Sequence, residues 1–495
     1  MTSQAPDPTM DDDAAVSAST VRTRADWRLK CATFDAPSGE LPANPKEECT
    51  RAILANPEDG LLWVQRSSLH LLQGRPANAA ADALRAVELL PKEPRAHMAA
   101  ARAYWDLTDY QTAVQYLKKA KPKEDEEVAA FLDECMNKAK EGLTPTQKMF
   151  KGKAMAWYTP SFTDRYDTPL CTVDELNSLI SSAASTCRAT VREADSHGGF
   201  GLFATESVKM DGSLLVEPAL FTVSVDTDLC LVCAKKMKST HACLYCGVEV
   251  YCSKECRKAA WGDYHRSQCG EVAKATHRLR DAFKNYVNDK KTTLLASYLP
   301  LAVSRIAGMI LAYQKELHGD GEPPPFAAWD RKTWPPLLRQ LSRLTDSSAA
   351  EEIRSQVSHP FDVWYTYHYH AGVINGSMPL DAVGKATFDF QFYEEVAHLC
   401  MANMIGTPSG NALVMMRGAC YANHSCLPNC VIDMDVEGLI VLRAKRAIAV
   451  GEELTISYID SKLPKDQRLE ALRQKYWFDC KCKACTNEDL RVGSA

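Results

Sequence analysis

The sequence lacks the long apolar run that a membrane-spanning helix requires. Its most apolar stretch, residues 299–313, contains Arg305 and is shorter than the roughly 20 residues needed to cross a bilayer. The N-terminal region has three consecutive aspartates at 11–13 and no apolar segment of the kind found in signal peptides. We therefore expect neither a membrane span nor secretion.

An excess of positive charge is also missing. The chain has 58 Lys and Arg against 63 Asp and Glu, for a net charge of -5. Sequence-independent binding to nucleic acid depends on neutralising many phosphates with Lys and Arg. A zinc-dependent nucleic-acid binder is therefore the least favoured hypothesis. The sequence has no strong basic localisation cluster, so we expect a protein of the cytoplasm, the nucleus or both.

The length and the cysteine content narrow the class further. A chain of 495 residues is too long for one hydrophobic core, so two to four domains are expected. Apolar residues make up 46% and charged residues 24%, as in ordinary globular proteins. Nineteen cysteines in a chain without a secretory signal favour metal-binding thiolates over disulfides.

A repeat of thirty-four residues occurs near the N-terminus. Ala52, Ala86 and Ala120 align at this offset, and so do Pro57 and Pro91. The period, and the paired helix-like segments around it, resemble tetratricopeptide repeats, whose units need stacked neighbours. We expect about three repeats over 45–142 with a groove for a peptide or protein partner. A helical bundle without a ligand is the alternative.

Residues 230–269 carry the strongest local signal, C-x2-C-x9-C-x2-C-x5-C-x3-C-x8-H-x3-C. Eight ligands suit two tetrahedral zinc sites. So short a segment has little core, and interleaved ligand pairs would tie its two ends together. We assign Cys230, Cys233, Cys252 and Cys256 to the first zinc, and Cys243, Cys246, His265 and Cys269 to the second.

The same segment, with "VYCSKECRKAAWGDYH" in its second half, resembles the MYND zinc finger. That family implies a module that binds proline-rich peptides, whereas a finger can equally brace its neighbours. The residues alone leave both roles open.

Thiolates recur at the C-terminus in Cys480-x-Cys482-x2-Cys485, one ligand short of a structural zinc site. Cys426, in the run "GACYANHSCLPNC", is the candidate for the fourth ligand, because it would staple the chain end over the loop containing Asn423. Cys420 and Cys430 compete for this role, and spacing does not decide among the three. Alternating apolar residues in "GLIVLRA" and "ELTISY" predict short strands after this loop.

The motifs "NHSCLPN", "GEELTISY" and "CKCKAC" resemble the SET domain and the cysteine motif that follows it. Together with the finger, they resemble the SET-MYND protein lysine methyltransferases. The implied fold class is α+β multidomain, with an N-terminal α-helical repeat, a β-rich SET domain split by the finger and a helical insert, and a C-terminal cysteine-rich zinc motif. The implied division is a disordered tail (1–44), helical repeats (45–142), a linker (143–187), the SET N-terminal part (188–229), the MYND finger (230–269), the helical insert (270–400), the SET C-terminal core (401–460), the post-SET zinc motif (461–485) and a tail (486–495).

The resemblance implies S-adenosylmethionine and three zinc ions as cofactors, and a protein substrate with a target lysine, histone or non-histone. Tyr458 matches the catalytic tyrosine, and an aromatic lysine channel would be lined by Tyr458, Tyr476 and Phe478. Residues that match cofactor contacts of the family are Gly199, Phe200, Gly201, Asn403, Asn423, His424, Tyr458 and Phe478.

Two features depart from that family. Phe200 stands where family members more often have a polar residue, and the helical repeats precede the SET domain instead of following it. Phe200 favours the competing hypothesis, a non-catalytic adaptor that binds protein partners through its repeats and finger. The order of the domains means that the substrates of family members are a poor guide to those of this chain.

Overall fold

The structure is a computed structural model that forms two compact units. The first unit is built mainly from residues 1–154, and the second mainly from residues 155–381 and 391–495. The predicted tail over 1–44 lies outside the described residues, as does nearly all of the tail over 486–495. The described residues are 45–72, 76–107, 109–140, 172–194, 200–224, 226, 228–270, 273, 274, 276, 277, 280, 294–319, 334–339, 392, 396, 399, 400, 403–407, 411–435, 437–476 and 478–486.

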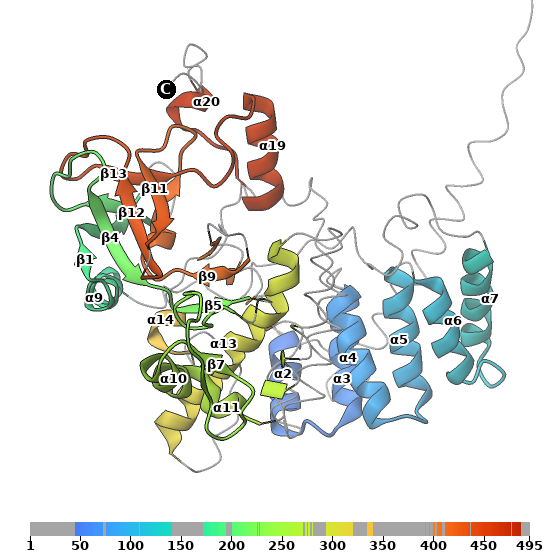
Figure 1. Cartoon of the computed structure of the whole chain (residues 1–495). Coiled ribbons are helices and arrows are strands. Elements are labelled where there is room, and N and C mark those ends of the chain that lie inside the picture. The colour runs from blue at the N-terminus through green and yellow to red at the C-terminus, as the bar shows by residue number, and fades with distance from the viewer. Residues whose placement is uncertain are drawn as a thin grey trace, which may run out of the picture. The chain divides into compact units, whose positions relative to one another are not determined.

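The described part of the first unit is helical (Figure 1). The helix α3 begins at residue 60 and α5 at residue 94, while α4 begins at residue 76 and α6 at residue 110. Within each pair the two starts are separated by the thirty-four residues of the sequence repeat. The period seen in the sequence is therefore the period of the helix pairs. The helices are α2 (Pro45–Ala55), α3 (Gly60–Leu72), α4 (Pro76–Leu89), α5 (Pro94–Asp106), α6 (Tyr110–Lys119) and α7 (Glu126–Lys140).

Equivalent loops precede α3 and α5, and in each loop a proline carbonyl is hydrogen-bonded to a ring nitrogen from the helix that follows. Trp63 Nε1 donates to the carbonyl of Pro57 at 3.0 Å. At the equivalent position in the next pair, His97 Nε2 lies 2.9 Å from the carbonyl of Pro91. Because a carbonyl oxygen only accepts, Nε2 of His97 carries the proton. The repeated prolines are thus the acceptors of a repeated loop contact.

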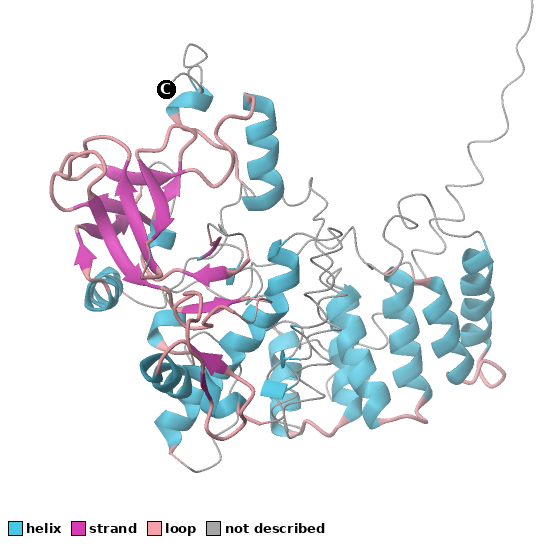
Figure 2. Ribbon diagram, viewed as in Figure 1, coloured by secondary structure: helices cyan, strands magenta, loops and turns pink. Residues whose placement is uncertain are grey.

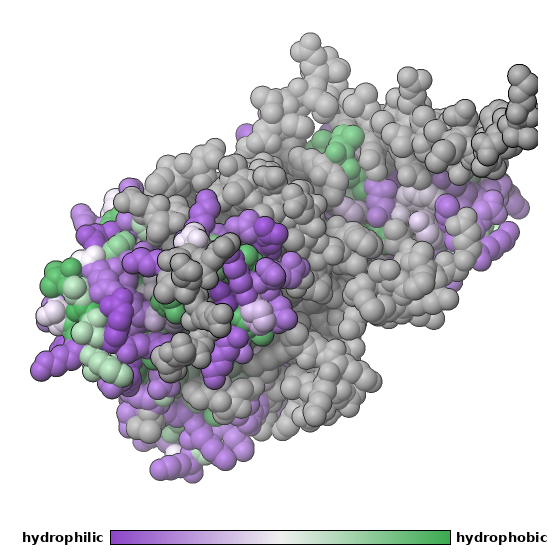
Figure 3. Space-filling view, turned by 90° about the horizontal axis from the view of Figure 1, so that it is seen from above, coloured by the Kyte–Doolittle hydropathy of each residue, from purple (hydrophilic) through white to green (hydrophobic). Residues whose placement is uncertain are grey.

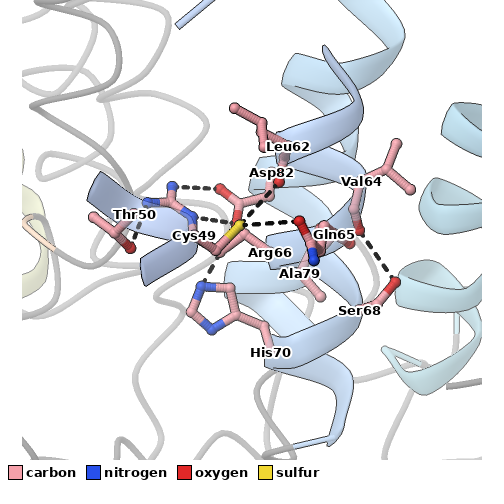
Figure 4. Close-up of polar contacts among 11 residues, drawn as sticks. Cys49, Thr50, Leu62, Val64, Gln65, Arg66, Ser68, His70, Ala79 and Asp82 are labelled. Atoms are coloured by element: carbon pink, nitrogen blue, oxygen red, sulfur yellow. Dashed lines mark hydrogen bonds and ion pairs between the residues drawn. The ribbon is translucent and has the colours of Figure 1, made fainter. Parts of the chain in front are cut away.

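A buried ion pair joins the first three of these helices (Figure 4). Arg66 on α3 donates to both carboxylate oxygens of Asp82 on α4 at 2.8 Å. The same guanidinium donates to Thr50 Oγ1 on α2 at 3.3 Å, and all three residues are buried. Removing one partner of such a pair costs about 3–5 kcal/mol, because the other charge would stay buried and unpaired.

The described part of the second unit contains four small sheets (Figure 2). The first has the order β1 (Thr186–Cys187), β4 (Ser213–Pro218), β12 (Leu439–Ala444), β11 (Cys430–Met434). The second has the order β10 (Asn423–His424), β13 (Glu453–Ile456), β3 (Phe200–Ala204), β2 (Ala189–Glu193). The third consists of β5 (Phe221–Val223), β9 (Leu413–Met415) and β8 (Met404–Gly406), and the fourth of β6 (His241–Ala242) and β7 (Val250–Tyr251).

Strands far apart in the sequence pair in each of the three larger sheets. β4 pairs with β12, β3 with β13 and β5 with β9, all antiparallel. The first strand of each pair precedes residue 224, and the second follows residue 412. Two separate segments therefore build these sheets, with the cysteine-rich segment between them in the sequence. The strands predicted from "GLIVLRA" and "ELTISY" are confirmed as β12 and β13.

The cysteine-rich segment packs against the long helix α13 (Leu294–His318) through the π-helical turn η1 (Trp261–His265) and α11 (Arg266–Gln268). The helix α10 (Lys254–Ala260) packs against η1. Gln268 Nε2 donates to the carbonyl of Ser304 at 2.5 Å. Ser267 Oγ donates to the carbonyl of Gly308 at 2.7 Å. A Cβ added at Gly308 would lie 2.5 Å from the Gln268 side chain, so the two segments are closely packed.

The turn between β11 and β12 contacts another part of the same segment. Lys235 and Glu437 form an ion pair. Gly438 has a φ of +75°, and a Cβ added there would lie 2.1 Å from the carbonyl oxygen of Cys233. The cysteine-rich segment is therefore braced by a sheet turn at one place and by α13 at another.

Part of the segment predicted to be a linker forms a helix. The helix α9 (Val173–Ala183) begins with a capping box, in which Thr172 Oγ1 accepts from Glu175 N and the Glu175 carboxylate accepts from Thr172 N. Asn177 then pairs with both backbone groups of Val191 on β2, at 2.7 and 3.1 Å. The "TVDE" signature could have revealed this helix start.

The described residues also form α19 (Lys465–Tyr476) and three short helices, η3 (Ala419–Tyr421), α14 (Pro336–Arg339) and α20 (Lys483–Thr486). Within the described residues, no helix has both the length and the apolar character needed to cross a membrane. Hydrophilic residues cover most of the described surface in the space-filling view, with small apolar groups among them (Figure 3).

The bracing contact at Gly438 can be tested by Gly438→Ala. Alanine in this left-handed conformation costs about 1–2 kcal/mol by itself. The new methyl group must also displace the Cys233 backbone, so we expect a larger loss of stability and weaker zinc retention by the neighbouring cysteines. Thermal unfolding at a fixed scan rate and the zinc content of the purified protein measure these two effects.

Gly451→Ala is the matched control. Gly451 has a nearly identical φ of +76°, but a Cβ added there meets no atom within 4 Å. This variant should lose only the conformational contribution and keep its zinc. Equal unfolding temperatures for the two variants would show that the contact with Cys233 contributes nothing.

Candidate functional site

The run 418–430 places its polar residues through a two-residue parallel pairing. Asn423 and His424, which form β10, pair with Thr455 and Ile456 of β13. The chain beyond β13 then passes beside His424, whose Nδ1 accepts from the backbone N of Tyr458 at 3.0 Å. The asparagine, the histidine and the tyrosine of the two predicted motifs are therefore brought together.

The hydroxyl of Tyr458 has a defined partner. It donates to the carbonyl of Ala422 at 3.0 Å, and the carbonyl of Tyr458 itself accepts from the Tyr476 hydroxyl at 3.3 Å. Burial, and to a lesser degree the nearby Tyr476, raise the pKa of Tyr458 above its ordinary value. The side chain is therefore a neutral phenol at neutral pH, suited to donating a hydrogen bond and unsuited to acting as a base.

Aromatic rings gather around this tyrosine. The ring centroid of Tyr458 lies 5.3 Å from that of His424, 5.0 Å from that of Tyr476 and 6.5 Å from that of Phe478. Burial also raises the pKa of Tyr476. The three residues predicted to line an aromatic channel thus lie together, and their surroundings disfavour charge.

A second group of polar atoms lies at the start of β3. Asn423 Nδ2 donates to the carbonyl of Phe200 at 3.2 Å and to Glu453 Oε1 at 2.9 Å. A Cβ added at Gly201 would lie 3.0 Å from Asn423 Nδ2, so the absence of a side chain permits this close approach. The predicted residue Gly199 lies outside the described residues.

Asn403 has a different setting. It is fully buried, its Nδ2 donates to the carbonyl of Leu399 at 2.7 Å, and its carbonyl accepts from Met416 N at 3.1 Å. The contact with Met416 joins the start of β8 to the segment that immediately precedes residues 418–430. The contact of Asn403 with a cofactor stays a prediction.

Four thiols converge near the C-terminus. The Sγ atoms of Cys426, Cys480, Cys482 and Cys485 all lie within 4.8 Å of one another, which is the donor set and number of a structural zinc site. The competing cysteines are engaged elsewhere. Cys420 Sγ donates to the carbonyl of Arg417 at 3.4 Å, and Cys430 lies on β11, where it pairs with Ala444 of β12.

His424 joins this thiol cluster to the tyrosine. Its Nδ1 accepts from Tyr458 N, so a neutral ring carries its proton on Nε2, which lies 3.3 Å from Cys426 Sγ. Hydrogen bonds to metal-bound groups orient the ligands and adjust their basicity. The imidazole is thus placed to donate to a zinc-bound thiolate while it holds the tyrosine backbone.

Two further groups of donors lie in the cysteine-rich segment. The structure brings together the same two interleaved sets of four that the spacing predicted, each with its donor atoms within 4.8 Å. The groups are Cys230, Cys233, Cys252 and Cys256, and Cys243, Cys246, His265 and Cys269. Burial lowers the pKa of His265, which favours the neutral ring that a metal requires.

Two residues at this site were not identified from the sequence. Glu453 pairs with Asn423, although the sequence indicated only that it begins the strand predicted from "ELTISY". Arg468 is buried and interacts with the thiols of Cys426 and Cys485, where its charge offsets that of thiolates. Its position within α19 carries no motif, so nothing in the sequence pointed to it.

The SET domain family matches residues 199–459, which is more than half of the chain, and the chain belongs to this family. The "SET domain and MYND-type zinc finger protein 6" of Schizosaccharomyces pombe is 28% identical over 298 residues, covering 59% of this chain and 50% of that protein. The "Histone-lysine N-methyltransferase SMYD3" of Homo sapiens is 30% identical over 303 residues, covering 59% and 60%.

The "N-lysine methyltransferase SMYD2" of Homo sapiens is 26% identical over 297 residues, covering 59% of each chain. The chain thus spans 50% to 60% of the length of these relatives. The predicted resemblance to SET-MYND proteins is confirmed by these matches.

The assignment of the fourth thiol can be tested by Cys426→Ser, with Cys430→Ser as the matched control. Both cysteines are buried and only four positions apart. We expect three zinc ions per chain in the unaltered protein, two in Cys426→Ser and three in Cys430→Ser. Metal analysis of the purified proteins gives the count. Loss of zinc from Cys430→Ser alone would overturn the assignment.

Proposed function

We propose that the chain is an S-adenosylmethionine-dependent protein lysine N-methyltransferase that acts on histone or non-histone lysines. One observation carries the proposal: the parallel pairing of β10 with β13 places Tyr458 beside His424 and next to Asn423. Membership of the SET domain family and the methyltransferase names of the SMYD relatives support it.

The residues around Asn423 fit the proposed cofactor. The carbonyl of Phe200 and the carboxylate of Glu453 are acceptors, which suit the cationic ammonium group of an amino acid. S-adenosylmethionine, when bound, supplies a methyl group attached to a positively charged sulfur. Phe200, Gly201, Asn423 and His424 would hold it, together with Gly199, Asn403, Tyr458 and Phe478 by family resemblance.

The chemical task of the chain is to present an uncharged lysine amine. A free lysine has a pKa near 10.4, so its deprotonation at pH 7 costs about 4–5 kcal/mol. Apolar surroundings reduce this cost by disfavouring the ammonium ion. Tyr458, Tyr476 and Phe478 supply such surroundings, since burial has already raised the pKa of both tyrosines.

Tyr458 acts in this scheme by position. Its neutral hydroxyl, held toward the carbonyl of Ala422, would orient the reacting groups without accepting a proton. Alignment of the amine with the methyl group then provides most of the rate enhancement.

The zinc ions would be structural. Each of the three donor groups has four ligands and leaves no open coordination position for a substrate. We propose the domain division given above, with residues 172–187 moved from the linker to the SET part. The bracing contacts at Gly438 and α13 favour a supporting role for the finger.

Partners beyond the substrate belong to the same proposal. Tyr245 is exposed on the finger and stacks on Trp261 with ring centroids 4.7 Å apart, a surface suited to proline-rich peptides. The tetratricopeptide-like helices would take a second peptide or protein partner. The proposed location is the cytoplasm, the nucleus or both.

The adaptor hypothesis rested on the apolar side chain of Phe200 at a position where family members more often have a polar residue. The structure weakens this argument. The contact of Phe200 with Asn423 uses the backbone carbonyl, which any residue would supply. An adaptor would show no saturable uptake of S-adenosylmethionine. Equilibrium binding of the labelled cofactor therefore separates the two hypotheses.

Tyr458→Phe tests the proposed activity. The variant keeps the aromatic ring but loses the hydroxyl bonded to Ala422, so we expect methyl transfer to fall roughly 100-fold, as when one preorganised hydrogen-bonding group is removed from an active site. Transfer from labelled S-adenosylmethionine into a cell extract measures the rate. Zinc content should not change, because Tyr458 is not one of the metal-binding residues.

The control is Tyr313→Phe, which removes a hydroxyl from α13. This variant should label the extract as well as the unaltered protein does. Equal labelling by Tyr458→Phe would refute the role assigned to Tyr458.

A further inference from the structure

Glu217 is a buried carboxylate to which the proposed reaction assigns no part. It lies near the end of β4, and its exposed fraction is 0%. An isolated carboxylate in such a place is costly unless hydrogen bonds compensate for the lost water. Its partners therefore show what the side chain is for.

Three consecutive backbone N–H groups donate to this carboxylate. Oε1 accepts from Arg417, Gly418 and Ala419 at 3.0, 3.1 and 3.1 Å. Oε2 accepts from Gly418 at 2.8 Å. The Arg417 guanidinium donates to the carbonyl of Pro218 at 3.1 Å. Glu217 thus caps the start of η3 from a strand about 200 positions earlier in the sequence.

The capped segment has no space in which to shift. A Cβ added at Gly418 would lie 2.6 Å from the Ile180 side chain and 3.1 Å from Glu217 Oε2. Gly418 is therefore held between α9 and the buried carboxylate. Glycine is required here by close approach, since a larger residue would push the segment off Glu217 or off α9.

The far end of the same short segment holds Tyr458. Tyr421 N donates to the carbonyl of Gly418 at 3.1 Å, and Ala422 N donates to the carbonyl of Ala419 at 3.2 Å. The carbonyl of Ala422, at the end of this turn, accepts the Tyr458 hydroxyl at 3.0 Å. One turn of chain thus connects the carboxylate to the phenol.

We propose that Glu217 is a positioning residue for Tyr458: it fixes residues 417–419 and thereby the carbonyl of Ala422 that orients the phenol. This role rests on the proposed methyltransferase function. Glu217 itself touches neither the reacting atoms nor, among the described contacts, Asn423.

Glu217→Gln is the first test. The amide oxygen can still accept from three N–H groups, but the amide nitrogen replaces the oxygen that faces Gly418 N, so donor meets donor. We expect kcat to fall about tenfold, with the KM for cofactor and protein substrate changed less than about twofold. Hydrogen exchange of the amides at 417–422 should quicken.

Glu217→Asp is the second variant, because it keeps the charge but withdraws the carboxylate by one methylene. It should show the same fall in kcat, and zinc content confirms that each variant is folded. Glu206→Gln is the matched control, since Glu206 is an exposed carboxylate paired with Arg188. The control should change neither kcat nor the amide exchange.

A double variant separates positioning from a general structural role. If Glu217 acts through the phenol, Glu217→Gln should lower the residual rate of Tyr458→Phe less than about twofold. A full tenfold further loss would overturn the proposal, and so would an unchanged kcat in Glu217→Gln. Absence of transfer by the unaltered protein would instead overturn the proposed function, and this role with it.

Discussion

The parallel pairing of Asn423 and His424 with the end of β13 is the constraint on which the site depends. It places Tyr458 N against one nitrogen of His424 and leaves the other nitrogen facing Cys426. It also holds Asn423 beside the strand that begins at Phe200. A pairing of two residues thus connects the polar group around Asn423, the aromatic cluster around Tyr458 and the thiol cluster.

The thiol groups and the tyrosine could be predicted because their signals are local. Spacing within forty residues was enough to sort eight ligands into two sets, which the structure brings together. Motif position was enough to place Tyr458 near His424. The choice of Cys426 over Cys420 and Cys430 required geometry, because three cysteines within ten positions of one another carry the same signal in a sequence.

The remaining contacts could not be predicted because they join distant segments through ordinary residues. In the sequence, Glu217 has no feature that distinguishes it from other strand residues. Only the three-dimensional structure shows the hydrogen bonds that its carboxylate accepts from Gly418 N. Glu453 and Arg468 likewise gain their roles from what packs against them. The helix α9 was missed for another reason, since its capping box lay in a stretch interpreted as a linker.

The split of the sheets has a consequence for biosynthesis. The cysteine-rich segment holds all eight of its ligands within residues 230–269, so it can bind metal and fold as soon as it leaves the ribosome. The strands β3, β4 and β5 must wait with unpaired edges until β9, β12 and β13 have been synthesised. Translation speed over the intervening residues therefore sets how long these edges stay exposed to aggregation.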